Sequence, residues 1–312
     1  MKYKKEVKKI KSAVDGLELD MITMIPKKGI KGIFQIHHGM SEYKERYLPF
    51  MEYLANEGFV AAIHDCRGHG KSIRSKDDMG YMYGGGAASL VEDTHQITME
   101  LKAKWPQLPV ILFGHSMGSM VVRNYTKKYD RDINMLIVCG SPSKNNLLFM
   151  GKMIAAIQGK LLGKHHISKV LELASFGAFA RKFPGEKSRF CWCCSVPGEI
   201  QKYENSSLCG FTFTVDGYDA LFQLMEETYS TRGWKMENPT LPVLFVGGAD
   251  DPCIGGPRKY AKAVQLMRQV GYKNTKGKLY PGMRHEILKE KDKERVFHDI
   301  VTYTKKQLRI NL

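Results

Sequence analysis

A serine between two glycines is the strongest sign of chemistry in this sequence. Gly114-His-Ser116-Met-Gly118 has the pattern G-x-S-x-G and directly follows the apolar run 110–113. A serine on a sharp turn from a strand into a helix is held with its Oγ exposed above the sheet. The amino end of that helix adds positive partial charge where an oxyanion would form. We therefore expect Ser116 to be a nucleophile, although a serine that only caps a helix would fit the same residues.

A serine hydroxyl needs a base to take its proton as it attacks. His285 follows the last apolar run, in a loop at the expected carboxyl end of the sheet, where ligands bind in open α/β folds. The base needs a carboxylate to orient it, and Asp251 follows the apolar run 243–246. The neighbouring Asp250 is an equal candidate on the residue pattern alone. The expected chemistry requires neither a metal nor an organic cofactor.

Two backbone amides are expected to stabilise the oxyanion of the reaction. One is the N–H of Met117, and the other is the N–H of Met40, in the loop after the run 33–36, where Gly39 lets the backbone come close. The other early or neighbouring histidines are expected to be structural, with two of them shaping this loop: His37, His38, His64, His69, His95 and His115.

The elements that must position these residues alternate between strands and helices. Alternating residues around Asp15-Gly16 predict an antiparallel hairpin at a sheet edge, and six later apolar runs are joined mostly by helical segments. This rhythm predicts a mostly parallel eight-stranded sheet with helices on both faces. It stops for about ninety residues after Gly140, so we expect a core of residues 1–142 and 236–312 with a folded cap insertion at 143–235.

Several separate segments, in chain order, carry a family pattern: His38-Gly-Met-Ser-Glu42 with Arg46-Tyr47, Asp65-Cys-Arg-Gly-His-Gly-Lys-Ser72, Gly114–Gly118, Gly248-Ala-Asp-Asp-Pro252 and Arg284-His-Glu286. Together they resemble the monoacylglycerol lipase and lysophospholipase branch of the α/β-hydrolases, especially its bacterial members. The resemblance implies a cap that carries an acyl-chain tunnel and favours Asp251 over Asp250 as the acid. Within the cap the chain departs from bacterial relatives, because Trp192-Cys-Cys-Ser-Val196 replaces a Trp-Leu-Ser-Arg-Asp segment and loses both charges.

The composition limits the classes of molecule that this protein is expected to bind. The net charge of +16 comes from lysines spread along the chain, without a nucleic-acid module, so solvated surface is the first interpretation and weak attraction to anionic membranes the second. Seven cysteines without a disulfide-framework spacing, together with no signal-length apolar run, predict a cytoplasmic protein with free thiols. The group at 191–194 lacks a second ligand cluster for a metal. The oligomeric state stays open.

These features predict a serine hydrolase that cleaves lipid carboxylic esters, monoacylglycerols or lysophospholipids, through an acyl-enzyme on Ser116. One alternative is a general carboxylesterase or aminopeptidase with the same three residues. Another is a non-catalytic protein that keeps the fold and binds a ligand under the cap. Only an activated serine reacts with a fluorophosphonate, so covalent labelling distinguishes an enzyme from a binding protein.

Overall fold

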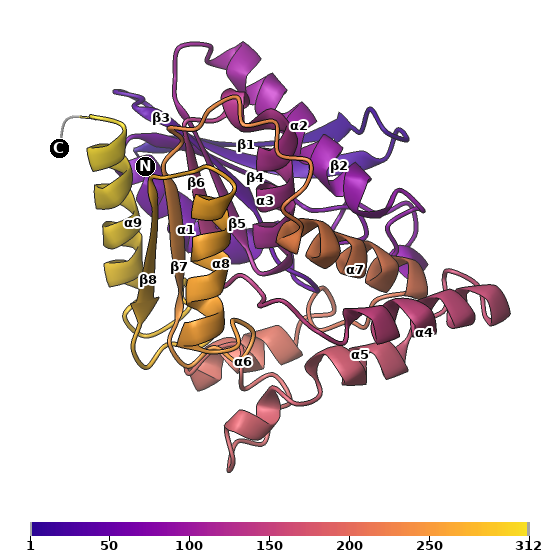
Figure 1. The fold of residues 1–312 in the computed structure, drawn as a ribbon. Coiled ribbons are helices and arrows are strands. Elements are labelled where there is room, and N and C mark those ends of the chain that lie inside the picture. The colour runs from indigo at the N-terminus through magenta and orange to yellow at the C-terminus, as the bar shows by residue number, and fades with distance from the viewer. Residues whose placement is uncertain (1, 311–312) are drawn as a thin grey trace.

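A single eight-stranded sheet forms the centre of the computed structural model, which describes residues 2–310 (Figure 1). The strands lie in the order β1-β2-β4-β3-β5-β6-β7-β8. β1 and β2 form the predicted edge hairpin, β2 is antiparallel to β4, and all other neighbours are parallel. The prediction of a mostly parallel eight-stranded sheet is therefore confirmed. The strands are β1 Tyr3–Lys11, β2 Glu18–Pro26, β3 Gly32–His37, β4 Phe59–His64, β5 Val110–His115, β6 Met135–Cys139, β7 Val243–Gly248 and β8 Thr275–Tyr280.

The central strands are apolar throughout because both faces of the sheet are covered. In β5 successive side chains enter opposite layers, with Val110 and Leu112 in one hydrophobic core and Ile111 and Phe113 in the other. Helices α2, α3 and α8 supply apolar side chains to the first core, whereas α1 and α9 supply the second. The helices are α1 Leu48–Asn56, α2 Gly86–Lys104, α3 Met117–Tyr129, α4 Leu148–Leu161, α5 Lys169–Phe176, α6 Pro197–Glu204, α7 Val215–Tyr229, α8 Pro257–Gln269 and α9 Lys293–Gln307.

The chain between β6 and β7 forms the four α-helices α4 to α7, and we call this segment the insertion or cap. In Figure 1, α4, α5 and α6 lie beyond the end of the sheet toward which β8 points, which is where the carboxyl ends of the parallel strands meet. α7 packs against α2 and α3 as well as against α4, so it joins the insertion to the core. The insertion thus stands over the sheet edge where the candidate catalytic residues were expected.

The sheet has two open edges, and the cysteines lie inside the molecule. β1 and β8 are the outermost strands. All seven cysteines are buried free thiols, and Cys193 and Cys194 pack with apolar side chains of the cap. Within residues 2–310 no helix has both the length and the apolar character that crossing a bilayer requires.

Candidate active site

Ser116 occupies a sharp turn between β5 and α3. Its backbone has φ 53° and ψ −119°, a conformation that residues other than glycine seldom adopt. A Cβ on Gly114 would lie 2.3 Å from the carbonyl oxygen of Gly118, and one on Gly118 would lie 2.4 Å from that of His37. Both glycines are therefore needed for the close backbone packing that holds the strained serine in place. Ser116 is only partly buried and lines a cavity.

His285 and Asp251 form a buried hydrogen-bonded pair. Nδ1 of His285 lies 2.8 Å from Oδ2 of Asp251. Because a carboxylate only accepts, Nδ1 carries a hydrogen, and in the neutral imidazole Nε2 then has the lone pair. Oδ1 of Asp251 accepts a further bond of 2.7 Å from the backbone N–H of Cys253. The rival Asp250 is exposed, so the structure brings Asp251 rather than Asp250 to the histidine.

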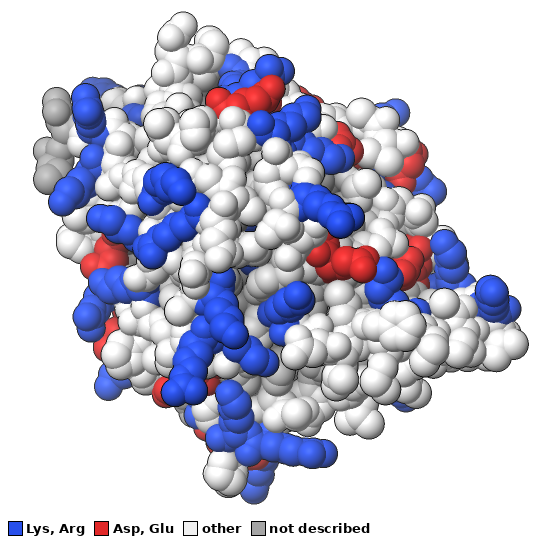
Figure 2. Space-filling view, in the orientation of Figure 1, with Lys and Arg blue, Asp and Glu red and all other residues white. Residues whose placement is uncertain are grey.

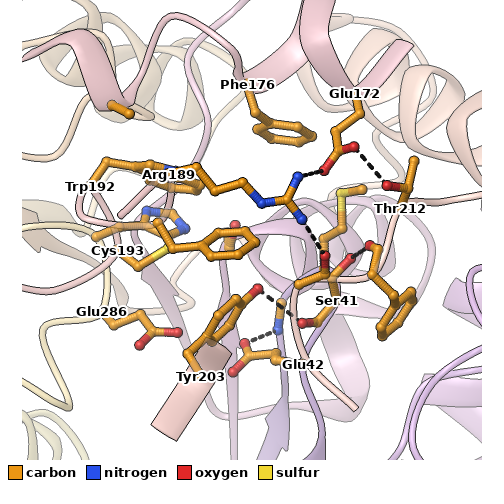
Figure 3. A pocket seen from close by; sticks show the side chains of 18 of the residues that line it. Ser41, Glu42, Glu172, Phe176, Arg189, Trp192, Cys193, Tyr203, Thr212 and Glu286 are labelled. Carbon is orange, nitrogen blue, oxygen red and sulfur yellow. Dashed lines mark hydrogen bonds and ion pairs between the residues drawn. The ribbon is translucent and has the colours of Figure 1, made fainter. Parts of the chain in front are cut away.

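Ser116 and His285 meet at one cavity of about 740 Å³ between the sheet edge and the cap. In the described part of the chain no hydrogen bond yet joins the serine hydroxyl to the imidazole. The rings of Trp192 and His285 lie 5.0 Å apart, so the tryptophan covers the histidine. Figure 3 shows Arg189 reaching across the cavity toward Glu172. The apolar part of the lining comes mainly from the cap: Leu173, Phe176, Ala180, Phe190, Trp192 and Phe211.

The loop after β3 lies against the serine, as the sequence predicts. A Cβ on Gly39 would come within 3.0 Å of the Ser116 Cβ, so only glycine permits this approach. Met40 lines the cavity, and neither its N–H nor that of Met117 has a hydrogen-bond acceptor within the described residues. His69 accepts a bond of 3.1 Å from the N–H of Ser41. The loop is thus held while two amides stay free beside the serine.

Three of the histidines expected to be structural support this loop. His38 Nε2 accepts from the N–H of Cys66 at 2.8 Å, so its Nδ1 donates to the carbonyl of Gly39 at 2.7 Å. Burial lowers the pKa of His37 to about 3 and that of His69 to about 3. These two imidazoles are therefore neutral near pH 7 and act through packing and hydrogen bonds.

Glu42 connects the loop after β3 to His115, the residue before Ser116, and the residue pattern did not reveal this connection. Its Oε1 accepts from the N–H of Gly39 at 2.6 Å and from the hydroxyl of Tyr47 at 2.9 Å, and it lies 3.2 Å from Nδ1 of His115. Burial raises the pKa of Glu42, but His115 and Arg46 outweigh it and hold that pKa well below its usual value. The side chain is therefore a carboxylate.

The same network reaches His285. Arg46 binds both oxygens of Glu286 at 2.6 Å and lies 3.3 Å from Glu42 through Nε. Nε2 of His115 lies 3.2 Å from the carbonyl of His285. Burial lowers the pKa of His115, but the hydrogen bond and charge of Glu42 outweigh it, and the net pKa is raised. Glu42 and Arg46 occur in the first segment of the resemblance, which is the signal that could have found them.

The side chains that could ligate a metal overlap the candidate catalytic pair. Ligand atoms of Asp251, Cys253 and His285 lie within 4.8 Å of one another, and all three residues are buried. Nδ1 of His285 is already engaged by the carboxylate, and burial raises the pKa of Cys253 well above its usual value. A neutral thiol is a poor metal ligand, so the geometry suits an acid–base pair better than a metal centre.

The fold and this site define a carboxylic ester hydrolase of the α/β-hydrolase fold. A family model described as serine aminopeptidase, S33 matches residues 28–292, so the chain belongs to that family. A monoglyceride lipase homolog of Monkeypox virus is 25% identical over 284 residues, covering 88% of this chain and 89% of the relative. A monoacylglycerol lipase of Mycolicibacterium smegmatis is 22% identical over 292 residues, covering 94% of each. A thermostable carboxyl esterase from Bacillus coagulans has the same fold, with a TM-score of 0.90 and 24% identity over 96% of this chain and 98% of its own.

Proposed function

We propose that the protein hydrolyses lipid carboxylic esters, monoacylglycerols or lysophospholipids, through an acyl-enzyme on Ser116. The observation that carries the proposal is the meeting of a strained serine and the His285–Asp251 pair at one cavity walled by apolar cap side chains. The cavity volume of about 740 Å³ is in the range that small-molecule ligands occupy. The proposed division is a core of residues 1–142 and 236–312 with a cap at 143–235.

In the proposed reaction, the Ser116 hydroxyl attacks the ester carbonyl while Nε2 of His285 takes its proton. The negative charge on the carbonyl oxygen is stabilised by the N–H groups of Met40 and Met117. Collapse of the intermediate breaks the bond to the alcohol, which leaves with the proton from His285. A water molecule then repeats the attack on the acyl-enzyme, and Ser116 regains its proton as the fatty acid departs. Asp251 stabilises the imidazolium in both halves of the reaction.

Charged residues at the rim of the cavity affect which lipid head group the protein would bind. Lys169 and Arg189 are exposed cavity residues, and Arg189 is 3.2 Å from Glu172. Two cations at the rim suit the phosphate of a lysophospholipid, whereas a monoacylglycerol needs only hydrogen-bonding groups. A panel of both lipid classes, with aminoacyl p-nitroanilides included, separates these substrates from the peptides that the family description suggests.

Ser116→Ala tests the proposal directly. The variant should remain folded, lose hydrolysis of p-nitrophenyl butyrate and lose labelling by a fluorophosphonate, because both reactions need the hydroxyl of the proposed nucleophile Ser116. Ser75→Ala changes an exposed serine elsewhere and should behave like the unmodified protein in both assays. Mass spectrometry should locate the adduct on Ser116. Turnover retained by Ser116→Ala, or an adduct on another serine, would refute the assignment.

A further inference from the structure

Large apolar side chains that stay exposed are concentrated in one part of the cap. Ten of the thirteen such side chains in the described chain belong to residues 147–173, which we call the cap arm. The arm contains α4 and the first part of α5, and in Figure 1 α4 extends away from the body of the molecule. The ten are Leu147, Phe149, Met150, Met153, Ile157, Leu161, Leu162, Ile167, Val170 and Leu173.

Most of α4 is not used for packing. Ala155 is its one buried residue, although the helix contacts α7 and α5. Phe149, Met153, Ile157 and Leu161 follow one another at intervals of four, so they share a helical face. Phe149 and Leu161 are 75% and 77% exposed. A water-soluble helix normally buries such a face, and contiguous exposed apolar surface marks a binding surface.

The charge of the arm identifies what would cover this face. The cap arm contains four lysines and one acidic residue, Glu172. One of the lysines, Lys152, pairs with Glu226 of α7 at 2.6 Å. The other three, Lys160, Lys164 and Lys169, are exposed, and Lys164 lies 4.0 Å from Asp216. Lys144, which precedes the arm, is exposed as well. Figure 2 shows α4 as a mostly uncharged projection with basic side chains near its far end.

The cap arm also borders the catalytic cavity. Leu173, on α5, is 70% exposed and lines the cavity, together with Lys169 and Phe176 of the same helix. The apolar surface of the arm therefore continues into the apolar wall around Ser116. A lipid that rests against the arm can enter the cavity without passing its acyl chain through water.

We propose that the cap arm docks onto anionic lipid membranes, inserting its apolar side chains between the head groups while its lysines bind the lipid phosphates. Interfacial helices of this kind combine buried apolar area with attraction to anionic lipid. A second copy of the chain is a poor occupant, because face-to-face arms would bring together four lysines from each copy against one acidic residue, Glu172. Docking itself is independent of the proposed function. Delivery of substrate from the membrane rests on that function.

Cosedimentation of the full chain with vesicles tests the docking. Wild type should bind vesicles of phosphatidylcholine and phosphatidylglycerol, and should bind pure phosphatidylcholine vesicles or salt-treated mixed vesicles much more weakly. The double variant Phe149→Ser, Leu161→Ser should bind at least about tenfold more weakly, because each change removes a large inserting side chain. Lys160→Gln and Lys164→Gln should each weaken binding about fivefold on the mixed vesicles. Val7→Ser, at a residue 59% exposed on β1, is the matched control and should bind like wild type.

Hydrolysis of p-nitrophenyl butyrate, a soluble ester, should be unchanged in all these variants, which also shows that they fold. Absence of binding by wild type, or equal binding by the Phe149→Ser, Leu161→Ser variant, would overturn the docking proposal. So would a wild-type dimer in sedimentation velocity that the same variant dissociates, because the arm would then be covered by a second copy. If vesicle binding behaves as expected while Ser116→Ala retains turnover, the proposed function fails and the docking proposal stands.

Discussion

Glu42→Gln is the sharpest test of the network behind the serine. The change keeps the shape of the side chain but removes its charge and converts one acceptor into a donor. Glu42 accepts from Gly39 and Tyr47, faces His115 and pairs with Arg46 at 3.3 Å. In the variant, either the amide NH₂ faces the guanidinium or the bond to Gly39 is lost.

The expected cost follows from these contacts. Removing one partner of a buried ion pair typically costs about 3–5 kcal/mol. Arg46 keeps its two bonds of 2.6 Å to Glu286, so we expect the lower end, about 3 kcal/mol of unfolding free energy. Losing one oxyanion donor outright costs about 10²–10³ in rate, and a displaced Gly39 moves the N–H of Met40 only partly. The kcat for p-nitrophenyl butyrate should therefore fall about 10- to 100-fold with KM nearly unchanged.

Urea unfolding and steady-state kinetics measure both effects. Glu45→Gln is the matched control, because Glu45 is only partly buried and its partner Lys44 keeps Asp20 and Asp65. It should stay within about 0.5 kcal/mol of wild type. If Glu42→Gln also stays within about 0.5 kcal/mol and retains its kcat, the network does not position the loop and the reasoning is wrong.

Two further predictions concern the histidines. Gly140 has φ +55°, and a Cβ there would lie 3.3 Å from Nδ1 of His285. Gly140→Ala should therefore displace the imidazole and lower kcat at least about tenfold. The control Gly163→Ala, at φ +85° in open space, should leave kcat unchanged, and equal kinetics for the two variants would contradict the prediction. Burial lowers the pKa of His37 and of His69 to about 3, against about 6.5 in the unfolded chain, so the unfolded chain binds more protons between these values. The free energy of unfolding that these two neutral histidines contribute above pH 6.5 is therefore lost as the pH falls, by about 2 kcal/mol for each histidine at about pH 5. Urea unfolding at the two pH values measures this loss, and an unchanged free energy of unfolding would contradict the prediction.

The strands could be predicted because buried parallel strands are continuous apolar runs. β6 begins and ends at the residues that its apolar run predicts. The starts of the helices are harder to predict from the sequence than the bounds of the buried strands. The apolar periodicity of α2 starts at Leu90, whereas the helix begins at Gly86, because the small residues there carry no such pattern. The helical pattern of α1 extends back to Arg46, whereas the helix begins at Leu48, after a 3-10 turn at Lys44–Tyr47 in which Arg46 pairs with Glu42 and with the distant Glu286.

The candidate site was predictable where its residues belong to local patterns. Ser116 could be found from flanking glycines, and His285 from its place after the last strand. Asp250 and Asp251 could not be separated by pattern, because only the turn after β7 decides which carboxylate faces the imidazole. The Arg46–Glu286 pair joins residues 240 positions apart, so no local signal could predict it.

The two edge strands have a consequence for how the protein behaves when concentrated. An outermost strand presents unpaired N–H and C=O groups that another chain can extend into a continuous intermolecular sheet, and lysines on such a strand oppose this by charge repulsion. Both edges of this sheet are basic, so strand-to-strand aggregation would have to bring like charges into register. Seven lysines on the edge strands thus oppose the pairing of copies of the chain: Lys4, Lys5, Lys8, Lys9 and Lys11 on β1 and Lys276 and Lys278 on β8.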